Sequence, residues 1–438
     1  MNLRVKRGQE HVRFWVLFAL LSTMIFARYG LQIDIPRVLA LVPILAIAFL
    51  GNQTEIIAIC MCLIPLHESL DFYYALVLVI TIYVLKCHRR IRINVSFILL
   101  LLIIIWELLH CFTPDFSPVD FVTSLAPTIA LTVILCSDLS DLDYAFVVRA
   151  VATAALVTCV TMLVQIAWAT EFNPVRFLAT LRRLGAANDP VMKRLQIAGG
   201  IVQTNSLGVI CVMITACLLQ LRECGQSKRS DVFVMLALVI FGTFTASRTF
   251  LVSLALMILL MLLGQKGVIK KLRYFIIAIL AVGFVVLFFS LFFPDQLSYY
   301  VSRFFEKDIT TGRDDLMIAY HRFITENMNV LFFGVGLQGY GDKLVDRYRV
   351  ARNVPHNSIQ EILVAWGIPG LLLIILLIMY LVYRANRYKG RRKLIHYIPL
   401  IIILFKSMAG QLLTSNYSML ALGFAYLNLI QDINKDTP

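Results

Sequence analysis

Runs of apolar residues, each near the length of a membrane-spanning helix, alternate with shorter polar stretches along most of this chain. The pattern predicts fourteen apolar helices, of which the second and third are short enough to be re-entrant or to form one bent unit. The predicted segments are 14–28, 37–51, 54–67, 72–86, 94–112, 119–136, 144–168, 201–221, 232–246, 248–264, 273–293, 357–383, 395–409 and 411–430. We therefore predict an all-α polytopic membrane protein with 12–14 transmembrane helices.

The composition supports a membrane protein and excludes several other classes. The 438 residues are 60% hydrophobic and 15% charged, whereas a soluble domain carries roughly 25% charged residues. These values exclude a soluble globular enzyme, a disordered protein and a disulfide-stapled secreted domain. The nine cysteines show no metal-ligand spacing, and we interpret them as small apolar residues of the membrane helices.

The basic residues gather in clusters between apolar segments, and these clusters predict the orientation of the chain. The net charge is +14, and cytoplasmic loops of membrane proteins carry an excess of Lys and Arg. With fourteen spans, the main clusters fall on the cytoplasmic side, at 4–13, 86–92, 222–229, 266–273 and 384–393. Both termini are then predicted to be cytoplasmic. No basic region resembles a nucleic-acid reader, so no nucleic-acid partner is expected.

Two connections are much longer than the others, and this topology places both on the outer face. The predicted parts are N-terminal transmembrane helices (1–168), a basic outer loop (169–200), central transmembrane helices (201–293), a large extracytoplasmic loop (294–356) and C-terminal transmembrane helices (357–438). Transporters usually hold their chemistry at the bilayer midplane. The long loops instead predict chemistry at the outer face.

The outer loop 169–200 is basic, which runs against the positive-inside rule. One interpretation is an anion site that includes Arg194, followed by a Gly-Gly pair and by Asn205 at the start of the next helix. The other is an amphipathic helix over 174–184 that lies on the lipid headgroups. The sequence alone leaves both interpretations open.

A Ser-Arg pair, Ser247-Arg248, lies between two apolar segments with almost no loop. Arg248 is therefore predicted at or just below the outer surface. There it either snorkels to the headgroups or faces inward and binds an anionic lipid headgroup.

The outer loop 294–356 has mixed charge, which is typical of a folded segment. We predict an amphipathic helix over 312–327 that lies on the membrane surface. Its apolar stripe consists of Leu316, Tyr320, Phe323 and Ile324. The glycine-rich stretch 334–341 has no strand and helix around it, so we interpret it as a flexible turn and not as a dinucleotide site.

His356 stands in a Pro-His-Asn-Ser sequence at the end of this loop, where the next membrane helix begins. The dipole at a helix N-terminus favours the neutral imidazole, and a neutral histidine can accept a proton from a hydroxyl group. Asn357 and Glu361 follow within the first turns. The alternative is an interfacial histidine that only caps the helix.

In their order and spacing, these motifs resemble the O-antigen ligase and polymerase family of lipid-linked polysaccharide enzymes. The resemblance covers roughly 190–375, whereas the N-terminal half matches only as generic membrane helices. The motifs are Arg194 with Asn205, Ser247-Arg248, Thr311-Gly312-Arg313, Gly334-Val335-Gly336, His356-Asn357 and Gly367-Ile368-Pro369-Gly370. Arg182 or Arg183 is an alternative to Arg194.

The resemblance implies a GT-C-like glycosyltransferase. Such an enzyme moves a glycan from undecaprenyl pyrophosphate to an acceptor hydroxyl at the outer face of the bacterial plasma membrane. It implies that Arg194, Arg248 and Arg313 bind the pyrophosphate, and that His356 orients or deprotonates the acceptor. Supporting roles would fall to Asn205, Asn357, Glu361 and Tyr340. The reaction is expected to invert the anomeric carbon and to use no metal ion and no cofactor.

The acceptor decides between two enzymes of this class. We favour a polymerase that joins lipid-linked repeat units, and the alternative is a ligase that uses lipid A-core or another non-repeat acceptor. A polysaccharide or lipid transporter is a further alternative, although the chain shows no clear internal repeat. The expected partners are the lipid-linked glycan, a glycan or lipid acceptor and membrane lipids, with a chain-length regulator and a flippase as further partners.

Overall fold

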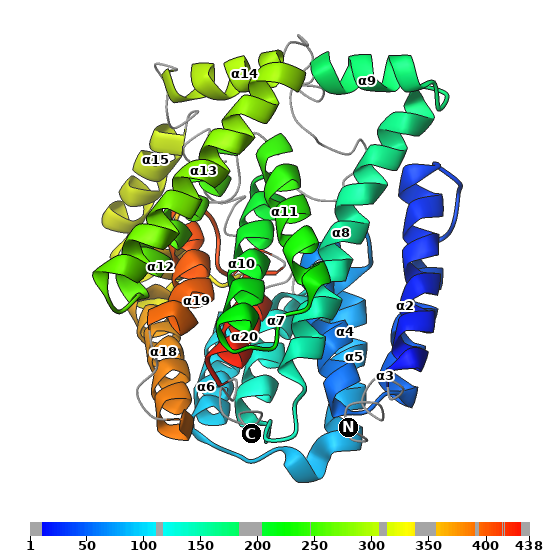
Figure 1. The fold of residues 1–438 in the computed structure, drawn as a ribbon. Coiled ribbons are helices and arrows are strands. Elements are labelled where there is room, and N and C mark those ends of the chain that lie inside the picture. The colour runs from blue at the N-terminus through cyan, green and yellow to red at the C-terminus, as the bar shows by residue number, and fades with distance from the viewer. Residues whose placement is uncertain are drawn as a thin grey trace. The chain divides into compact units, whose positions relative to one another are not determined.

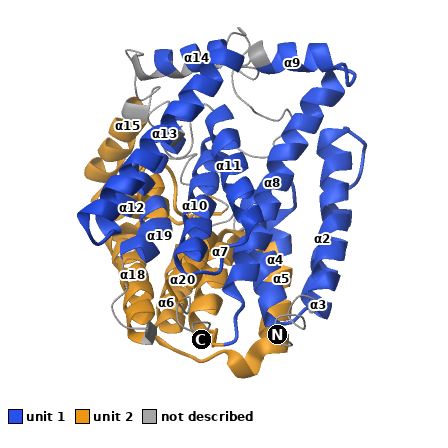
Figure 2. Ribbon diagram, viewed as in Figure 1, with its two compact units in different colours: residues 1–75, 141–307, 393–402 blue, residues 76–140, 308–392, 403–438 orange. Residues whose placement is uncertain are grey.

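A computed structural model describes residues 11–110, 117–183, 204–245, 247–305, 313–337, 356–389, 394–413, 415 and 417–430. The described residues are overwhelmingly helical, and their only extended pairing is an isolated bridge between Ile91 and Ser137 (Figure 1). The chain forms two compact units (Figure 2). Unit 1 comprises 1–75, 141–307 and 393–402, and unit 2 comprises 76–140, 308–392 and 403–438.

Unit 1 contains the N-terminal and central helices. In chain order they are α2 (Val12–Ile25), a π-helical turn (Phe26–Gly30), a 3-10 turn (Arg37–Ala40), α3 (Leu41–Leu50), α4 (Gln53–Leu66), α8 (Tyr144–Ala169), α9 (Pro174–Arg183), α10 (Thr204–Glu223), α11 (Arg229–Phe244), α12 (Arg248–Gly264), α13 (Val268–Phe292) and α14 (Pro294–Phe305).

Unit 2 contains the remaining helices. They are most of α5 (Phe72–Cys87), a 3-10 turn (His88–Arg90), α6 (Val95–His110), α7 (Pro118–Cys136), α15 (Arg313–Glu326), α16 (Met328–Phe333), α18 (Ser358–Lys389) and α20 (Ser418–Ile430). The boundary between the units falls within α19 (Leu394–Met408).

Each of the fourteen predicted apolar segments contains a helix. Among the described residues, six helices are long and apolar enough to cross a membrane. They are Val12–Gly30, Phe72–Arg90, Tyr144–Ala169, Asn205–Glu223, Val268–Phe292 and Ser358–Arg387. Apolar side chains of α13 are strongly exposed, for example Ile269 (84%) and Leu280 (65%). An apolar surface of this kind requires lipid around it, and the protein is a multi-pass membrane protein.

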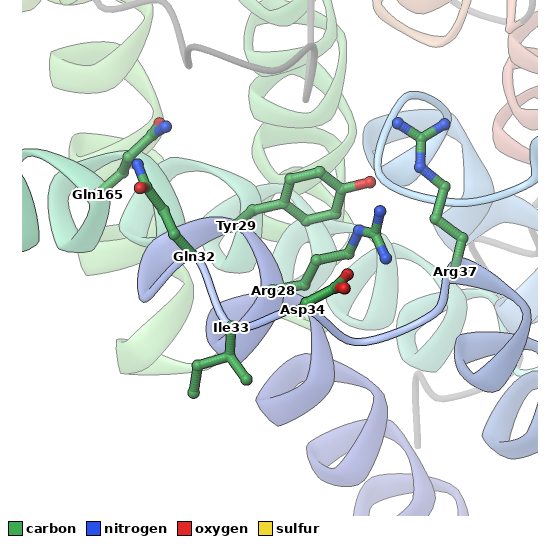
Figure 3. Close-up of a pocket in the computed structure, with 7 residues that line it drawn as sticks. All are labelled: Arg28, Tyr29, Gln32, Ile33, Asp34, Arg37 and Gln165. Carbon is green, nitrogen blue, oxygen red and sulfur yellow. The ribbon is translucent and has the colours of Figure 1, made fainter.

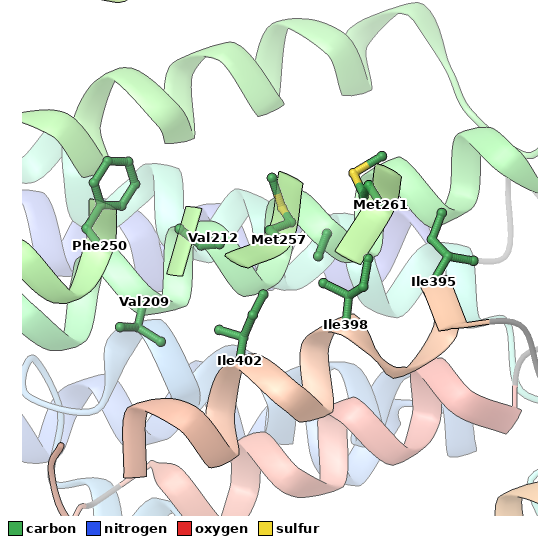
Figure 4. Close-up of a cluster of buried hydrophobic side chains, with 9 residues drawn as sticks. Val209, Val212, Phe250, Met257, Met261, Ile395, Ile398 and Ile402 are labelled. Atoms are coloured by element: carbon green, nitrogen blue, oxygen red, sulfur yellow. The ribbon is translucent and has the colours of Figure 1, made fainter. Parts of the chain in front are cut away.

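A cluster of buried apolar side chains in unit 1 lies where α10, α12 and the start of α19 meet (Figure 4). It consists of Val209, Val212, Ala216, Phe250, Met257, Met261, Ile395, Ile398 and Ile402. α4 is buried along almost its whole length, and Glu55 at its start closes a capping box with Asn52. Glu55 also bonds to His11, whose Nδ1 lies 3.0 Å from the carboxylate. A buried carboxylate with these partners keeps the start of α4 fixed.

Short helices lie across one end of unit 1. α9 confirms the helix predicted over 174–184, and it contacts α14. In Figure 1 both run roughly perpendicular to α8 and α13, which lead into them. α14 was not predicted as a helix, although its Tyr, Val and Phe residues recur at helical spacing.

Candidate functional site

Arg248 lies at the junction between α11 and α12. The residue before it, Ser247, makes polar contacts that fix this junction. Ser247 is the N-cap of α12, where its side chain accepts a hydrogen bond from the Phe250 backbone N–H at 3.3 Å. The Ser247 hydroxyl also donates to Oδ1 of Asn205 at 2.9 Å. Asn205 lies inside the first turn of α10, so its side chain ties the start of α10 to the start of α12.

Close packing around Phe250 holds the same junction. Phe250 is fully buried, and two glycines of neighbouring helices make room for it. A Cβ atom on Gly242 would stand 2.2 Å from the Phe250 ring, and one on Gly208 would stand 2.8 Å from Phe250 Cβ. Small residues of this kind allow helices in a membrane to approach closely. The first turn of α12 is therefore fixed against α10 and α11.

Arg248 is the first residue of α12 and is half-buried. The backbone N–H groups of a helix start attract anions, and a guanidinium group there adds a full positive charge. Arg248 thus occupies a position that suits phosphate binding.

In unit 2, α15 confirms the helix predicted over 312–327, but its apolar stripe does not face lipid. The four stripe residues are between 0% and 6% exposed. They pack with Val330 of α16 and Val364 of α18. Gln360 of α18 also donates to the Met317 carbonyl oxygen at 3.0 Å. The apolar stripe is therefore covered by protein from later in the chain.

α18 is broken at Gly367, which has φ of 65°. Because Pro369 has no N–H group and Gly367 is not helical, carbonyl groups in the preceding turn lose their usual helical partners. Other groups replace them. The Val335 N–H donates to Val364 O at 2.9 Å, and the Gly336 N–H donates to Ala365 O at 2.8 Å. The Trp106 indole N–H donates to the Trp366 carbonyl oxygen at 2.9 Å.

The turn Gly334-Val335-Gly336 therefore packs against the broken part of α18 and has a backbone conformation that allows this contact. Gly334 has φ of 79° and Gly336 φ of 83°, a region that favours glycine. A Cβ atom on Gly334 would lie 2.4 Å from the Ala365 carbonyl oxygen. The prediction of a flexible turn was wrong for these residues, because three successive residues after Phe333 bond to fixed partners.

Glu107 of α6 joins this turn to the break from the other side. Its carboxylate accepts hydrogen bonds from the Leu337 N–H at 3.0 Å and from the Trp366 indole N–H at 2.5 Å. Glu107 is 1% exposed. Glu107 is therefore a packed polar residue with fixed hydrogen-bond partners. His110, one turn later, has Nε2 2.8 Å from the Phe333 carbonyl oxygen.

His356 precedes the start of α18, as predicted, and is half-buried. Asn357 caps the helix, since its side chain accepts from the Ile359 N–H at 2.9 Å. Ser358 then donates to the Ser407 carbonyl oxygen at 2.6 Å. The residues around His356 are therefore anchored to α19.

Glu361 is fully buried, and its carboxylate is hydrogen-bonded to the backbone. One oxygen of its carboxylate accepts from the N–H groups of Leu412 and Leu413, at 2.7 and 3.0 Å. Burial raises the pKa of the nearby Tyr320 hydroxyl well above its usual value, and the charge of Glu361 adds to this shift. Glu361 thus clamps the first half of α18 to the turn before α20.

The structure brings together only part of the predicted site. Asn205, Ser247 and Arg248 meet in unit 1, and His356, Asn357 and Glu361 lie within two turns in unit 2. Arg194 and Tyr340 lie outside the described residues, as do Thr311 and Gly312 of the Gly-Arg motif. The side chain of Arg313 lies outside them too, although Arg313 begins α15.

No group of three or more His, Cys, Asp or Glu residues suited to a metal ion occurs in the described part of the chain. The roles of Trp106 and Glu107 were not predicted from the sequence, because their partners lie more than 200 positions away. A single acidic residue in the apolar run 94–112 was the available signal.

These features describe a multi-pass membrane protein with anchored polar side chains at several helix starts and at one helix break. Residues 232–375 match the model of the O-antigen ligase family, which covers polymerases and ligases that transfer lipid-linked glycans. The predicted resemblance is confirmed over this segment, about a third of the chain. The match includes Arg248, the Gly-Val-Gly turn, His356 and the α18 break, while Arg194 and Asn205 precede it. No curated protein matches the chain.

Proposed function

We propose that the protein transfers a glycan from undecaprenyl pyrophosphate to an acceptor hydroxyl group at the outer face of the bacterial plasma membrane. The family match over 232–375 carries this proposal, because it contains both the Arg248 junction and the His356 helix start. We favour polymerisation of lipid-linked repeat units into a surface polysaccharide. A ligase with a non-repeat acceptor is the alternative.

In the proposed reaction, His356 takes the proton from the acceptor hydroxyl as its oxygen attacks the anomeric carbon. A new glycosidic C–O bond forms, and the bond from that carbon to the pyrophosphate oxygen breaks. Undecaprenyl pyrophosphate leaves with the bonding electron pair. Attack from the side opposite the leaving group inverts the anomeric carbon, and the activated donor supplies the driving force.

Arg248 would bind the pyrophosphate and offset the negative charge that grows on it, which is electrostatic stabilisation of the transition state. Its position at the start of α12 supports this role, because the helix dipole acts in the same direction. Arg194 and Arg313 are proposed as further pyrophosphate ligands, and Tyr340 as a supporting residue. With arginines in this role, the reaction needs no metal ion.

Asn205, Asn357 and Glu361 would act by positioning. Asn205 accepts a hydrogen bond from Ser247, the residue before Arg248, and so fixes the start of α12. Asn357 caps the helix that follows His356. Glu361 holds that helix from inside. The fold is proposed to be GT-C-like with cytoplasmic termini, which the basic clusters favour. A flippase that delivers the donor and a chain-length regulator are proposed partners.

An assay with purified protein in proteoliposomes tests this function. A synthetic undecaprenyl-pyrophosphate repeat unit is the sole glycan, and products are resolved by size. A ladder of repeats is expected for a polymerase. Product only after addition of a second acceptor would identify the ligase. Movement of the lipid-linked glycan across the bilayer without any new glycosidic bond would overturn the proposal in favour of a transporter.

A further inference from the structure

A polar cavity of about 290 Å³ lies in unit 1, and none of its lining residues belongs to the segment 232–375 that carries the family match (Figure 3). It forms where the end of α2 meets α8. The lining residues are Arg28, Tyr29, Gln32, Ile33, Asp34, Arg37 and Gln165. Only Ile33 among them is aliphatic, so the cavity suits a hydrophilic ligand and not a lipid chain.

The backbone holds this cavity open at a fixed place. α2 ends in the π-helical turn Phe26–Gly30, and the next residues fold back by hydrogen bonds from the Leu31 N–H to Phe26 O and from the Ile33 N–H to Ala27 O, both 2.9 Å. A Cβ atom on Gly30 would lie 2.8 Å from Val164. α2 therefore abuts α8 closely, and the segment after it turns outward over the cavity.

The cavity carries a net positive charge, because two arginines and one aspartate line it. Neither Arg28 nor Arg37 forms an ion pair among the described residues, although Asp34 also lines the cavity. Arg28 lies over the Tyr29 ring, 5.5 Å from its centre. In Figure 3 the guanidinium groups of Arg28 and Arg37 point to the same side. This arrangement leaves two planar hydrogen-bond donors for a ligand.

Tyr29 supplies an independent indication. It is 7% exposed, and its buried hydroxyl group has no hydrogen-bond partner in the described structure. An unsatisfied buried hydroxyl is costly, and such groups in native proteins often mark a place where a ligand or water completes the bonding. The hydroxyl lies on the side of the cavity toward Arg37 in Figure 3.

We propose that this cavity binds a sugar ring of the glycan on which the protein acts. The inference rests on the proposed function. The mixture of donors and acceptors favours a sugar, because hydroxyl groups both donate to Asp34 and accept from arginine or amide groups. A site for a bare phosphate would gain nothing from the carboxylate of Asp34, which repels an anion. The volume suits one or two sugar rings.

The predicted orientation agrees with this assignment. With a cytoplasmic N-terminus, α2 crosses the membrane once and places Arg28 and Arg37 on the outer face, against the positive-inside rule. A binding role accounts for two arginines at that place. α8 continues from the cavity into α9 at the same end of unit 1.

A binding experiment tests the proposal without requiring catalysis. The probe is the repeat-unit oligosaccharide released by mild acid from the lipid carrier of the source organism. Its binding to the purified full chain is measured by saturation-transfer NMR and calorimetry. Arg28→Gln with Arg37→Gln is expected to weaken binding at least about tenfold. Lys270→Gln with Lys271→Gln removes the same charge from exposed positions at the start of α13 and is expected to change nothing.

Further variants keep the test decisive. Tyr29→Phe removes only the hydroxyl group and is expected to weaken binding by a few-fold with unchanged melting temperature. Oligosaccharide binding by a protein that transfers no glycan would contradict the proposed function and leave the cavity assignment intact. Wild-type affinity and wild-type chain growth in the double arginine variant would overturn the assignment. The assignment would also fail if this variant lost only co-purified phospholipid and still bound the oligosaccharide normally.

Discussion

The Arg248 junction and the α18 break both hold a predicted functional residue near a helix start, but by different means. At the junction, Phe250 fills the space that Gly208 and Gly242 leave, and a few polar contacts suffice. At the break, backbone and side-chain donors from α6 and the Gly-Val-Gly turn reach the carbonyl groups of α18. The difference follows from the backbone. An intact helix in a membrane satisfies its own hydrogen bonds, whereas a broken one needs partners from elsewhere.

This contrast predicts which substitutions each region tolerates. The junction should be more sensitive to a change in side-chain volume than to the loss of one polar contact. The break should be sensitive to the loss of one acceptor or donor, even when the volume is unchanged.

Phe250→Ala is the substitution with the largest expected effect on stability. It leaves a cavity among α10, α11 and α12, and Phe→Ala changes in packed cores cost about 3–5 kcal/mol. The measurement is the melting temperature of the purified protein in detergent. Phe233→Ala is the control, since Phe233 is 72% exposed and should face lipid. Equal melting temperatures for the two variants would show that packing does not hold the junction.

Glu107→Gln probes the break with almost no change in volume. An amide offers one acceptor oxygen in place of two, so the N–H group of Leu337 or of Trp366 loses its partner. The expected cost is about 1–3 kcal/mol for an unsatisfied buried group, again measured as a fall in melting temperature. Glu326→Gln, at an exposed position at the end of α15, is the matched control. A Glu107 variant as stable as this control would mean that the break is held by packing alone.

Arg248→Lys is expected to have the smallest of these effects and to spare stability. A lysine keeps the charge but loses the planar fork that binds two phosphate oxygens. We expect glycan transfer to fall by about tenfold, or about 1.4 kcal/mol, with an unchanged melting temperature. Arg273→Lys, in α13 at the other predicted face, serves as control. Full transfer activity in Arg248→Lys would favour the snorkelling interpretation of this residue.

Several parts of this picture could be predicted from sequence because they depend on local pattern. Apolar runs located the fourteen helices, and spacing located α9 and α15. The Pro-His-Asn-Ser sequence placed the start of α18, since a helix start depends on neighbouring residues.

Other parts depend on contacts that no local pattern encodes. Glu107 and Trp366 are 259 positions apart, and a single sequence gives no means of pairing them. The Gly-Val-Gly stretch was interpreted as flexible because its partners in α18 were unknown. The stripe of α15 was assigned to lipid for the same reason: amphipathic spacing predicts a buried face but not what covers it.

A single-turnover transfer assay with His356→Ala tests the central chemical claim most directly. Equal amounts of the variant and the wild type are compared in proteoliposomes, with the lipid-linked repeat unit as donor. Their melting temperatures are first shown to be the same. Loss of a general base is expected to slow transfer by about 10²–10⁴-fold, while donor binding is retained. Transfer by His356→Ala at the wild-type rate would contradict the claim and leave His356 as a residue that only precedes the cap of α18.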